Sequence, residues 1–238
     1  MTSDQASSSG PPPTPGIAVV YEDDHVWAVA KPEGLAAIPE RDVTRPCVQH
    51  LLADQVGAQV WVVHRLDKEV SGVMLFARSA TAHRWFSTQF AERRVHKQYL
   101  ALVHGRVATD QGRIEWPLRV CGSGRVAVDP ERGRPSVTEY AVIARGADHT
   151  LITAEPVTGR QHQIRAHLYG LGHALVGDLR YGDPARSGAA PRLMLHAAVL
   201  SCQLPGGGPL TVCVAPSPGF VAAVHQVAGL AVPTTEWH

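Results

Sequence analysis

The sequence predicts an α+β fold built on a mixed or largely antiparallel sheet. Short apolar runs bounded by Gly and Pro, which are typical of strands, outnumber the segments with helical periodicity. The helical segments are not interleaved one by one with the strands, as a doubly wound parallel sheet would require. The chain has 238 residues, of which 45% are hydrophobic. That is enough to bury a sizeable core in one large domain or two small ones.

The first third of the chain is expected to hold a tail, two strands and a helix. Residues 1–16 are rich in Ser and Pro and show no apolar periodicity, which predicts a disordered tail. Apolar runs at 17–20 and 26–30 predict two strands joined by an acidic turn. A helix is predicted over about 46–55, with the following Gly57 as its stop.

In the middle of the chain, strands are predicted at 60–63, 73–77 and 95–103. Ser79 is the predicted N-cap of a helix that runs to about residue 93, because apolar side chains recur there every four residues. Farther on, several strand-like runs are separated by Gly and Pro. Residues 122–127 match a loose dinucleotide-binding pattern, but no helix follows them, so they are interpreted as a hairpin turn.

The last part of the chain predicts two strand pairs and two helices. The strands are expected at 138–144, 150–154, 193–201 and 210–214, and the helices at about 161–169 and from Ser217 onward. One domain is therefore expected over 17–232, followed by a short tail at 233–238.

Charge is distributed unevenly along the chain, although the net charge is only +1. Residues 61–125 hold 11 Lys and Arg against 5 Asp and Glu, whereas residues 1–60 hold 3 against 8. A basic middle third could present one positive face to phosphates. A solvated surface stretch is the alternative.

The sequence shows no pattern typical of a metal site, a redox motif or a membrane span. The four cysteines include no C-x-x-C pair, so free thiols are expected, with a bridge between Cys202 and Cys213 across a hairpin as the alternative. His162 and His167 are five residues apart, which is poor helical spacing for two metal ligands. The N-terminus has neither the basic start nor the apolar stretch of a signal peptide. We therefore expect a cytoplasmic protein.

A carboxylate and two cations stand together where a short apolar strand ends, in His64-Arg65-Leu66-Asp67-Lys68. Loops held by a rigid sheet are where catalytic groups tend to lie. Nearby positive charge favours the ionised carboxylate that a nucleophile requires. By itself, the pattern also fits a turn held by a surface ion pair.

Polar side chains gather near the start of the helix that is predicted after Gly159. Gln161 and Arg165 are four residues apart and are expected to share one face. Backbone N–H groups at a helix N-terminus favour anions such as phosphate. An amphipathic helix with a polar outer side is the alternative.

Basic residues stand beside an aromatic residue in 93–99, a combination typical of proteins that hold phosphates and stack bases. Val95, Lys97 and Tyr99 are expected to share one face of the predicted strand. A half-buried sheet tyrosine whose hydroxyl reaches water is the alternative for Tyr99.

In this order and wording, the segments resemble the RluA family of pseudouridine synthases. Five stretches carry the resemblance: VVYEDDHVWAVAKPEG from Val19, HRLDKEVSGVMLFARS from His64, KQYLALVHG from Lys97, TGRQHQIRAHLYGLGHALVGDLRYG from Thr158 and RLMLHA from Arg192. The resemblance spans roughly Ile17 to Ala215, which is nearly the whole chain that is predicted to be ordered. Only 16 residues precede Ile17, so the chain resembles the short, single-domain branch that lacks an S4 RNA-binding domain.

The resemblance implies the pseudouridine synthase fold, with a bent mixed sheet, flanking helices and a basic cleft. Asp67 is implied to be the catalytic carboxylate and Arg165 its ion-pair partner. Tyr99 is implied to stack on the target base and to assist removal of the C5 proton. Arg65 is implied to hold the flipped nucleotide out of the RNA helix. The other residues expected to bind substrate are His64, Arg160, His162 and Leu195.

The expected reaction is the isomerisation of specific uridines in ribosomal RNA, transfer RNA or both. Such an isomerase would need no metal and no cofactor, and its partner would be structured RNA, bound by a monomer. A non-catalytic RNA-binding module is the alternative, but it would not require Asp67, Tyr99 and Arg165 together. A hydrolase with an Asp nucleophile would need a second acid or base beside Asp67, and none is evident in the sequence.

Overall fold

The computed structural model describes residues 16–42, 44–122, 124–182 and 190–233. The predicted tails, 1–16 and 233–238, lie outside these ranges except for Gly16 and Pro233. The strands are β1 (Ala18–Glu22), β2 (Val26–Lys31), β3 (Trp61–Val62), β4 (Ser71–Ala77), β5 (His96–His104), β6 (Gln111–Ile114), β7 (Leu118–Val120), β8 (Val126–Val128), β9 (Thr138–Arg145), β10 (His149–Pro156), β11 (Leu195–Gln203) and β12 (Pro209–Cys213). The helices are α1 (Val48–Val56), α2 (Ala80–Ala91), α3 (Gln163–Gly170) and α5 (Pro218–Ala228).

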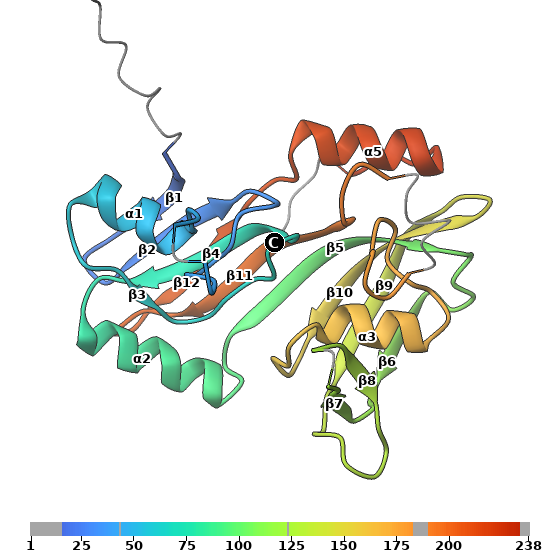
Figure 1. Ribbon diagram of the computed structural model, residues 1–238, viewed down its shortest axis with the longest axis horizontal. Coiled ribbons are helices and arrows are strands. Elements are labelled where there is room, and N and C mark those ends of the chain that lie inside the picture. Colours follow the sequence, from blue (N-terminus) through green and yellow to red (C-terminus); the bar gives the residue numbers. More distant parts are fainter. Residues whose placement is uncertain (1–15, 43, 123, 183–189, 234–238) are drawn as a thin grey trace, which may run out of the picture.

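Ten of the strands form one mixed sheet, which confirms the predicted α+β class. Its order is β1-β2-β4-β11-β5-β10-β9-β6, with β3 beside β4 and β12 beside β11 (Figure 1). Within the described residues, β4 and β11 run parallel and the other paired strands run antiparallel. Figure 1 shows that the strands on the two sides of β5 run in clearly different directions.

Of the four helices in the described residues, three have a predicted end. Ser79 caps α2 by accepting a hydrogen bond from the Ala82 N–H at 3.1 Å, and Ser217 caps α5 in the same way. Gly57 ends α1 in the left-handed conformation, with φ of 64°. The fourth helix, α3, begins two residues later than expected, because His162 takes a left-handed backbone, with φ of 49°, that the first helical turn does not allow.

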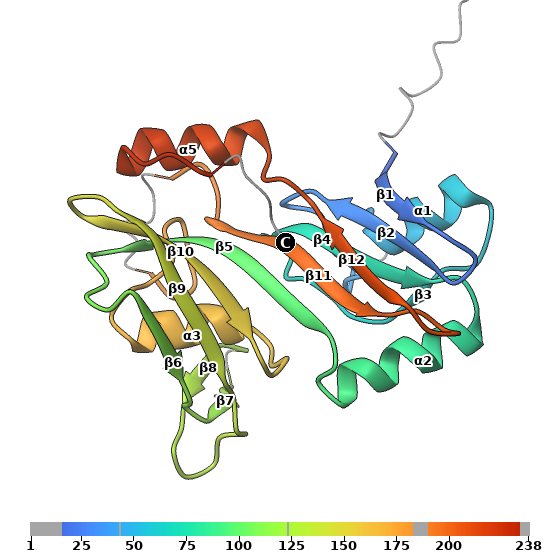
Figure 2. The same cartoon turned by 180° about the vertical axis from the view of Figure 1, so that it is seen from behind.

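Alternate side chains of β5 enter two separate cores. Ala101 and Val103 pack into the larger core, which also holds buried side chains of α1, α2 and α3. Leu100 and Leu102 point the other way, into a second core beneath α5. Figure 1 and Figure 2 accordingly show α3 and α5 on opposite sides of the sheet around β5 and β10. The period of two along β5 therefore allows one strand to support helices on both faces.

Strands β7 and β8 form a hairpin that is separate from the large sheet. Its turn contains the glycine-rich segment, so the predicted hairpin turn is confirmed. Leu118 and Val126 of the hairpin pack on Ala166 of α3 and on Tyr181. The hairpin is thus fixed against the helix that carries Arg165.

The parallel contact between β4 and β11 is short and very close. It pairs Ser71 with His196 and Gly72 with Ala197. Gly72 has φ of 123°, and a Cβ at this position would lie 2.1 Å from the Ala197 carbonyl oxygen. The Ser71 hydroxyl also lies 2.8 Å from His196 Nδ1. Only a glycine at position 72 therefore lets the two strands approach this closely.

The cysteines are free thiols, as expected, within the part of the chain that the structure describes. The β11–β12 register sets Cys202 opposite Leu210 and Cys213 opposite Val199, so the two thiols do not face each other across the hairpin. In the described ranges, no helix is both long and apolar enough to cross a bilayer.

The contact at Gly72 gives a stability prediction. Gly72→Ala should lower the free energy of unfolding by about 3 kcal/mol, since the methyl group would collide with backbone and the positive φ disfavours a side chain. Gly122→Ala is the matched control, because a Cβ added at position 122 would meet nothing within 4 Å. Urea unfolding of both variants measures the difference, and equal midpoints would contradict this account of the β4–β11 contact.

Candidate active site

A groove of about 620 Å³ lies where the loop before β4, strand β5 and the start of α3 meet. We call it the central groove. Its walls include all eight residues that the sequence suggested for the site: His64, Arg65, Asp67, Tyr99, Arg160, His162, Arg165 and Leu195. These residues come from separate segments of the chain, so the fold is what brings them together.

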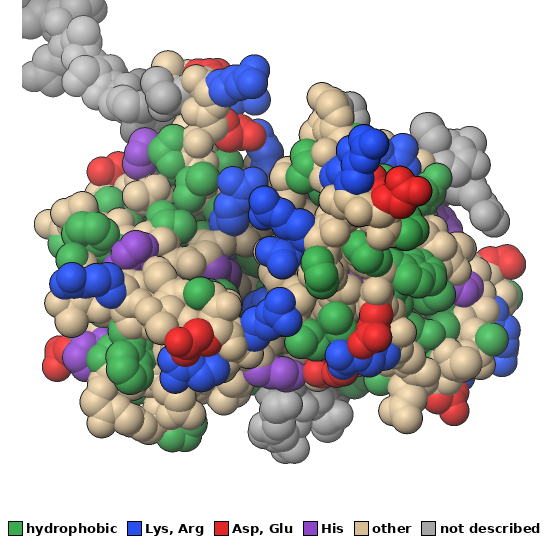
Figure 3. Space-filling model, turned by 90° about the horizontal axis from the view of Figure 1, so that it is seen from below, with side chains coloured by type: hydrophobic (Ala, Val, Ile, Leu, Met, Phe, Trp, Pro, Cys, Tyr) green, Lys and Arg blue, Asp and Glu red, His purple; other side chains and the backbone are tan. Residues whose placement is uncertain are grey.

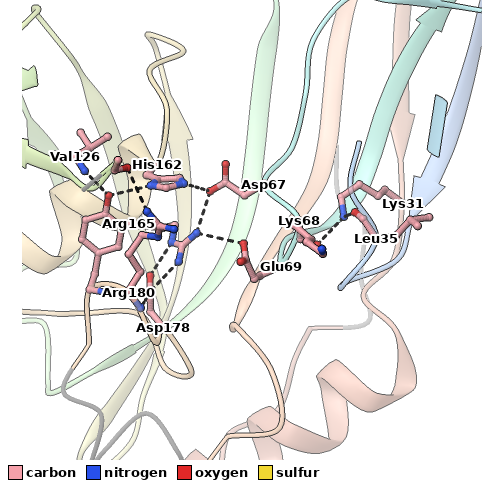
Figure 4. Close-up of polar contacts among 12 residues, drawn as sticks. Lys31, Leu35, Asp67, Lys68, Glu69, Val126, His162, Arg165, Asp178 and Arg180 are labelled. Atoms are coloured by element: carbon pink, nitrogen blue, oxygen red, sulfur yellow. Dashed lines mark hydrogen bonds and ion pairs between the residues drawn. The ribbon is translucent and has the colours of Figure 1, made fainter. Parts of the chain in front are cut away.

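A buried lysine holds the backbone of the loop that carries Asp67. Lys31 is 2% exposed, and its Nζ donates to the carbonyl oxygens of Pro32, Leu35 and Lys68 at 2.6–3.0 Å (Figure 4). Burial lowers the pKa of Lys31 to about 8, although nearby carboxylates oppose the shift. Three carbonyl acceptors stabilise the ammonium and hold the chain next to Asp67 in one position.

His64 fixes the other end of the same loop. Its Nε2 accepts the Leu75 N–H of β4 at 2.9 Å, and its ring stacks on Phe90 with centroids 4.8 Å apart. Burial, and to a smaller extent the charge of Lys97, lowers the pKa of His64 to about 3. His64 is therefore a neutral ring at neutral pH, and it joins the Asp67 loop to the sheet.

Arg165 projects from α3 into the protein interior, where its guanidinium hydrogen-bonds two carboxylates and lies 3.5 Å from a third, that of Glu69. Its Nε and Nη2 donate to the two oxygens of Asp178, each at 2.8 Å, and its Nη1 donates to Asp67 Oδ2 at 3.1 Å. Burial disfavours the charge, but the hydrogen bonds and charges of Asp178 and Asp67 outweigh it and raise the pKa of Arg165 above its usual range. The cation is therefore permanent, and the bidentate contact with Asp178 fixes its direction.

The two oxygens of Asp67 have different surroundings. Oδ2 receives the Arg165 hydrogen bond and lies 3.7 Å from His162 Nε2. Among the described residues, no group bonds Oδ1, and Figure 4 shows it pointing away from the guanidinium. The side chain is 19% exposed. Asp67 thus has one oxygen held by the protein and one oxygen open to a ligand.

Strand β5 forms the opposite wall with Lys97 and Tyr99, which lie on one face as predicted. Leu195 of the neighbouring β11 lines the same wall. Burial, and then the negative charge of Asp67, raises the pKa of the Tyr99 phenol above its usual range. Burial also lowers the pKa of Lys97 to about 8. Tyr99 consequently presents a neutral ring to the groove at neutral pH.

Cations dominate the charged lining of the central groove. Lys and Arg side chains gather along the hollow between the two halves of the molecule (Figure 3). Those that line the groove are Arg65, Arg93, Lys97, Arg160 and Arg165, beside the single carboxylate of Asp67. Arg94, from the same basic segment as Arg93, does not line the groove and instead forms an exposed ion pair with Glu92.

The expectation that Gln161 and Arg165 share a polar face is wrong. Gln161 precedes the helix and is exposed, whereas Arg165 is 3% exposed. The spacing rule failed because α3 begins only at Gln163. The buried amide of Gln163 explains that start, since its Oε1 accepts from the Thr158 hydroxyl and the Arg160 N–H and fixes the turn before the helix.

Sequence reasoning missed three residues that support the site: Lys31, Asp178 and Tyr181. Asp178 and Tyr181 belong to the stretch from Thr158 that carried the resemblance. A charged Asp followed three residues later by Tyr gave no signal of its own. Their importance depends on burial, which is 0% exposure for Asp178 and 1% for Tyr181.

In the part of the chain that the structure describes, no group of three or more His, Cys, Asp and Glu side chains could hold a metal ion. His167 points away from His162 and contacts the Thr138 hydroxyl and the Trp116 carbonyl oxygen, each at 2.9 Å. These two histidines therefore do not form a pair of ligands.

Comparisons with known proteins identify the family of the chain. The family model described as RNA pseudouridylate synthase matches residues 25–169. The dual-specificity RNA pseudouridine synthase RluA of Escherichia coli K12 is 38% identical over 202 residues, which are 83% of this chain and 92% of that protein. RluA of Vibrio cholerae is 37% identical over 219 residues, covering 91% of this chain and 89% of that protein.

Two solved human structures share the fold. Human RNA pseudouridylate synthase domain containing 1 has a TM-score of 0.75 at 28% identity, with 87% of each chain covered. Human RNA pseudouridylate synthase domain containing 4 has a TM-score of 0.73 at 25% identity, with 88% of this chain and 92% of that chain covered.

The Arg165–Asp178 contact predicts a large loss of stability when it is broken. Asp178→Asn should lower the free energy of unfolding by about 3 kcal/mol, because it leaves the buried guanidinium without its main counter-charge. Asp110→Asn is the control, since Asp110 is 88% exposed in its ion pair with Arg145 and should change stability by less than about 1 kcal/mol. Denaturant titration tests both, and a mild effect at Asp178 would refute the assigned role.

Proposed function

Because the chain belongs to the RNA pseudouridylate synthase family, and is therefore an isomerase that acts on uridine in RNA, we propose that Asp67 is its catalytic carboxylate. We also propose that its substrates are structured ribosomal and transfer RNA. The observation that supports Asp67 most directly is the division of its oxygens, with Oδ2 bound by Arg165 and Oδ1 open to the groove. The hydrogen bond from Arg165 to Oδ2 fixes the direction of the carboxylate.

The open oxygen is suited to attack at a sugar carbon. Oδ1 of Asp67 bonds C1′ of the uridine, and the C1′–N1 bond breaks with its electron pair remaining on the uracil. The base then turns, C5 bonds C1′, and the carboxylate departs with its bonding pair. Loss of the C5 proton and protonation of N1 complete an isomer of the starting uridine. Atoms and electrons balance without a redox partner, so we propose no cofactor and no metal.

The uridine must leave the base stack to reach this carboxylate. Arg65 is exposed and lines the groove next to Asp67, so we propose that it occupies the space that the flipped nucleotide leaves. We propose that Tyr99 contacts the uracil ring from the opposite wall. Its raised pKa favours a neutral ring over a phenolate, so we assign it to contact with the base rather than to removal of the C5 proton.

The remaining groove residues are proposed to shape the substrate site. Arg160 supplies positive charge near the start of α3, and Leu195 supplies an apolar wall. We propose that His64 acts through the position of the Asp67 loop, because its Nε2 is already occupied by a backbone N–H. His162 lies close enough to Asp67 to influence the carboxylate directly.

Family membership favours catalysis over a purely RNA-binding role. The relatives named dual-specificity enzymes support a proposal of two RNA classes for this chain. We propose a cytoplasmic monomer, because ribosomal and transfer RNA are met there and one groove of this chain contains the whole set of proposed residues.

The catalytic role of Asp67 is tested by tritium release from RNA labelled at C5 of uridine. The wild type should release tritium from ribosomal RNA, transfer RNA or both. Asp67→Asn should fold normally and lose on the order of 10³-fold or more in rate, since a nucleophile is removed. Asp110→Asn is the matched control and should keep the wild-type rate. An active Asp67→Asn enzyme would refute the proposed nucleophile.

The basic lining predicts which charges meet phosphate. Arg93→Ala and Lys97→Ala should each weaken RNA binding, and each should reduce the slope of log affinity against log salt by about 0.7–0.9 if one phosphate contact is lost. Arg94→Ala should leave both unchanged, because Arg94 pairs with Glu92 outside the groove. Filter binding over a range of salt concentrations makes the comparison. Equal slopes for the three variants would argue against this path for the RNA.

A further inference from the structure

Two non-glycine residues with positive φ occur among the described residues, and both line the central groove. They are Arg93, with φ of 59°, and His162, with φ of 49°. A left-handed backbone is unfavourable for such residues and persists where the surrounding structure enforces it, often at functional sites. His162 is also the N-cap of α3, yet its side chain makes no capping hydrogen bond. A side-chain cap on α3 therefore does not explain the left-handed backbone of His162.

The imidazole of His162 lies at the end of a chain of hydrogen bonds. The Val126 N–H donates to the Tyr181 hydroxyl oxygen at 2.8 Å, and this hydroxyl lies 3.0 Å from His162 Nδ1 (Figure 4). After accepting from Val126, the hydroxyl still has its own hydrogen to donate, and we assign that hydrogen to Nδ1 of His162. Burial lowers the pKa of His162, against the opposing charge of Asp67. A neutral imidazole that accepts at Nδ1 carries its hydrogen on Nε2.

The hydrogen on Nε2 faces the carboxylate. Nε2 lies 3.7 Å from Asp67 Oδ2, which is the oxygen that Arg165 already binds. This distance is longer than a hydrogen bond, but catalytic contacts commonly shorten when a substrate closes the site. A second donor on Oδ2 would concentrate the protein's contacts on one oxygen and leave Oδ1 for C1′.

We propose that His162 is a positioning residue, held as the Nε2–H tautomer by Tyr181, which directs a hydrogen bond to Oδ2 of Asp67 during the reaction. The inference rests on the proposed function, in which Asp67 is the catalytic carboxylate. In this proposal the β7–β8 hairpin orients the Tyr181 hydroxyl, because the Val126 N–H donates to the hydroxyl oxygen. The hairpin thereby controls where the proton of His162 lies.

Several charged groups surround the series of hydrogen bonds that ends at His162. Asp67 and Glu69 approach from the loop before β4, Arg165 from α3, and Arg180 from the segment that carries Tyr181. Arg125 of the hairpin lies over the Tyr181 ring at 5.1 Å. His162 therefore has more than one source of charge around it, and a test must separate its tautomer from the general electrostatics of the groove.

The first measurement is the ¹⁵N spectrum of the His162 ring in the wild-type protein, assigned by comparison with His162→Gln. A protonated Nε2 and an unprotonated Nδ1 are expected at neutral pH. The opposite tautomer, or a doubly protonated ring, would overturn the proposal. This readout does not depend on whether any Tyr181 variant folds.

Single-turnover rates with saturating enzyme provide the second measurement. His162→Leu should slow the reaction by about tenfold or more, because a hydrogen bond to a charged group is lost, with little change in RNA affinity. His162→Gln should recover most of the rate, since its amide can donate an N–H from a similar position. Equal losses in the two variants would overturn the proposal.

The link to Tyr181 is tested with a double-mutant cycle. Tyr181→Phe should slow the single-turnover step by about threefold to tenfold and move the acid limb of its pH profile to higher pH, because the neutral ring loses its hydrogen-bond donor. In a His162→Gln background the same change should have no further effect. Tyr169→Phe is the matched control, because Tyr169 is an exposed tyrosine that also contacts Arg125, and it should keep the wild-type rate and profile.

The two levels of the proposal fail in different ways. If the wild type releases no tritium, or if Asp67→Asn stays active, the proposed function fails. If the wild type is active and Asp67→Asn is not, but Tyr181→Phe and His162→Gln act additively, the function stands and the role of His162 is overturned.

Discussion

The arrangement of the groove depends on one buried guanidinium. Arg165 uses two of its nitrogens to bind Asp178 and a third to bind Asp67. A buried arginine is tolerated only when its charge is paired and its donors are satisfied. The helix, the loop before β4 and the segment at Asp178 must therefore come together for this charge to be buried at all. The guanidinium that is buried in this way also holds one oxygen of Asp67 in position.

Strands of the sheet form walls of the groove beside the contact between Arg165 and Asp67. Strand β5 faces the groove with Lys97 and Tyr99 and faces the second core with Leu100. Its period of two therefore separates groove-lining side chains from this core within one strand. The short parallel contact at Gly72 joins β4 to β11. It places the end of the Asp67 loop beside β11, which is the neighbour of the strand that carries Tyr99.

Two details of the groove differ from what residue spacing alone indicates, and they differ for the same physical reason. Spacing within a predicted helix paired Gln161 with Arg165, but the helix starts at Gln163 and turns Arg165 inward. Arg93 and Arg94 belong to one basic segment, yet Arg93 lines the groove while Arg94 pairs with Glu92. Direction at a helix end depends on backbone conformation and on tertiary partners, and neither can be derived from the spacing of residue types.

The sequence by itself determined the fold class and most element positions, and its resemblance to the RluA family indicated eight residues that line the groove. Alternation, caps and turn residues are local signals, and the order of motifs is specific. Only the tertiary structure decided that Asp178 and Tyr181 support the site, because their roles arise from burial and from hydrogen bonds to residues distant in sequence, as when Val126 contacts Tyr181. It also decided which oxygen of Asp67 stays open. Electrostatic and hydrogen-bond geometry of this kind exists only after the chain has brought separate segments into a common, water-poor interior.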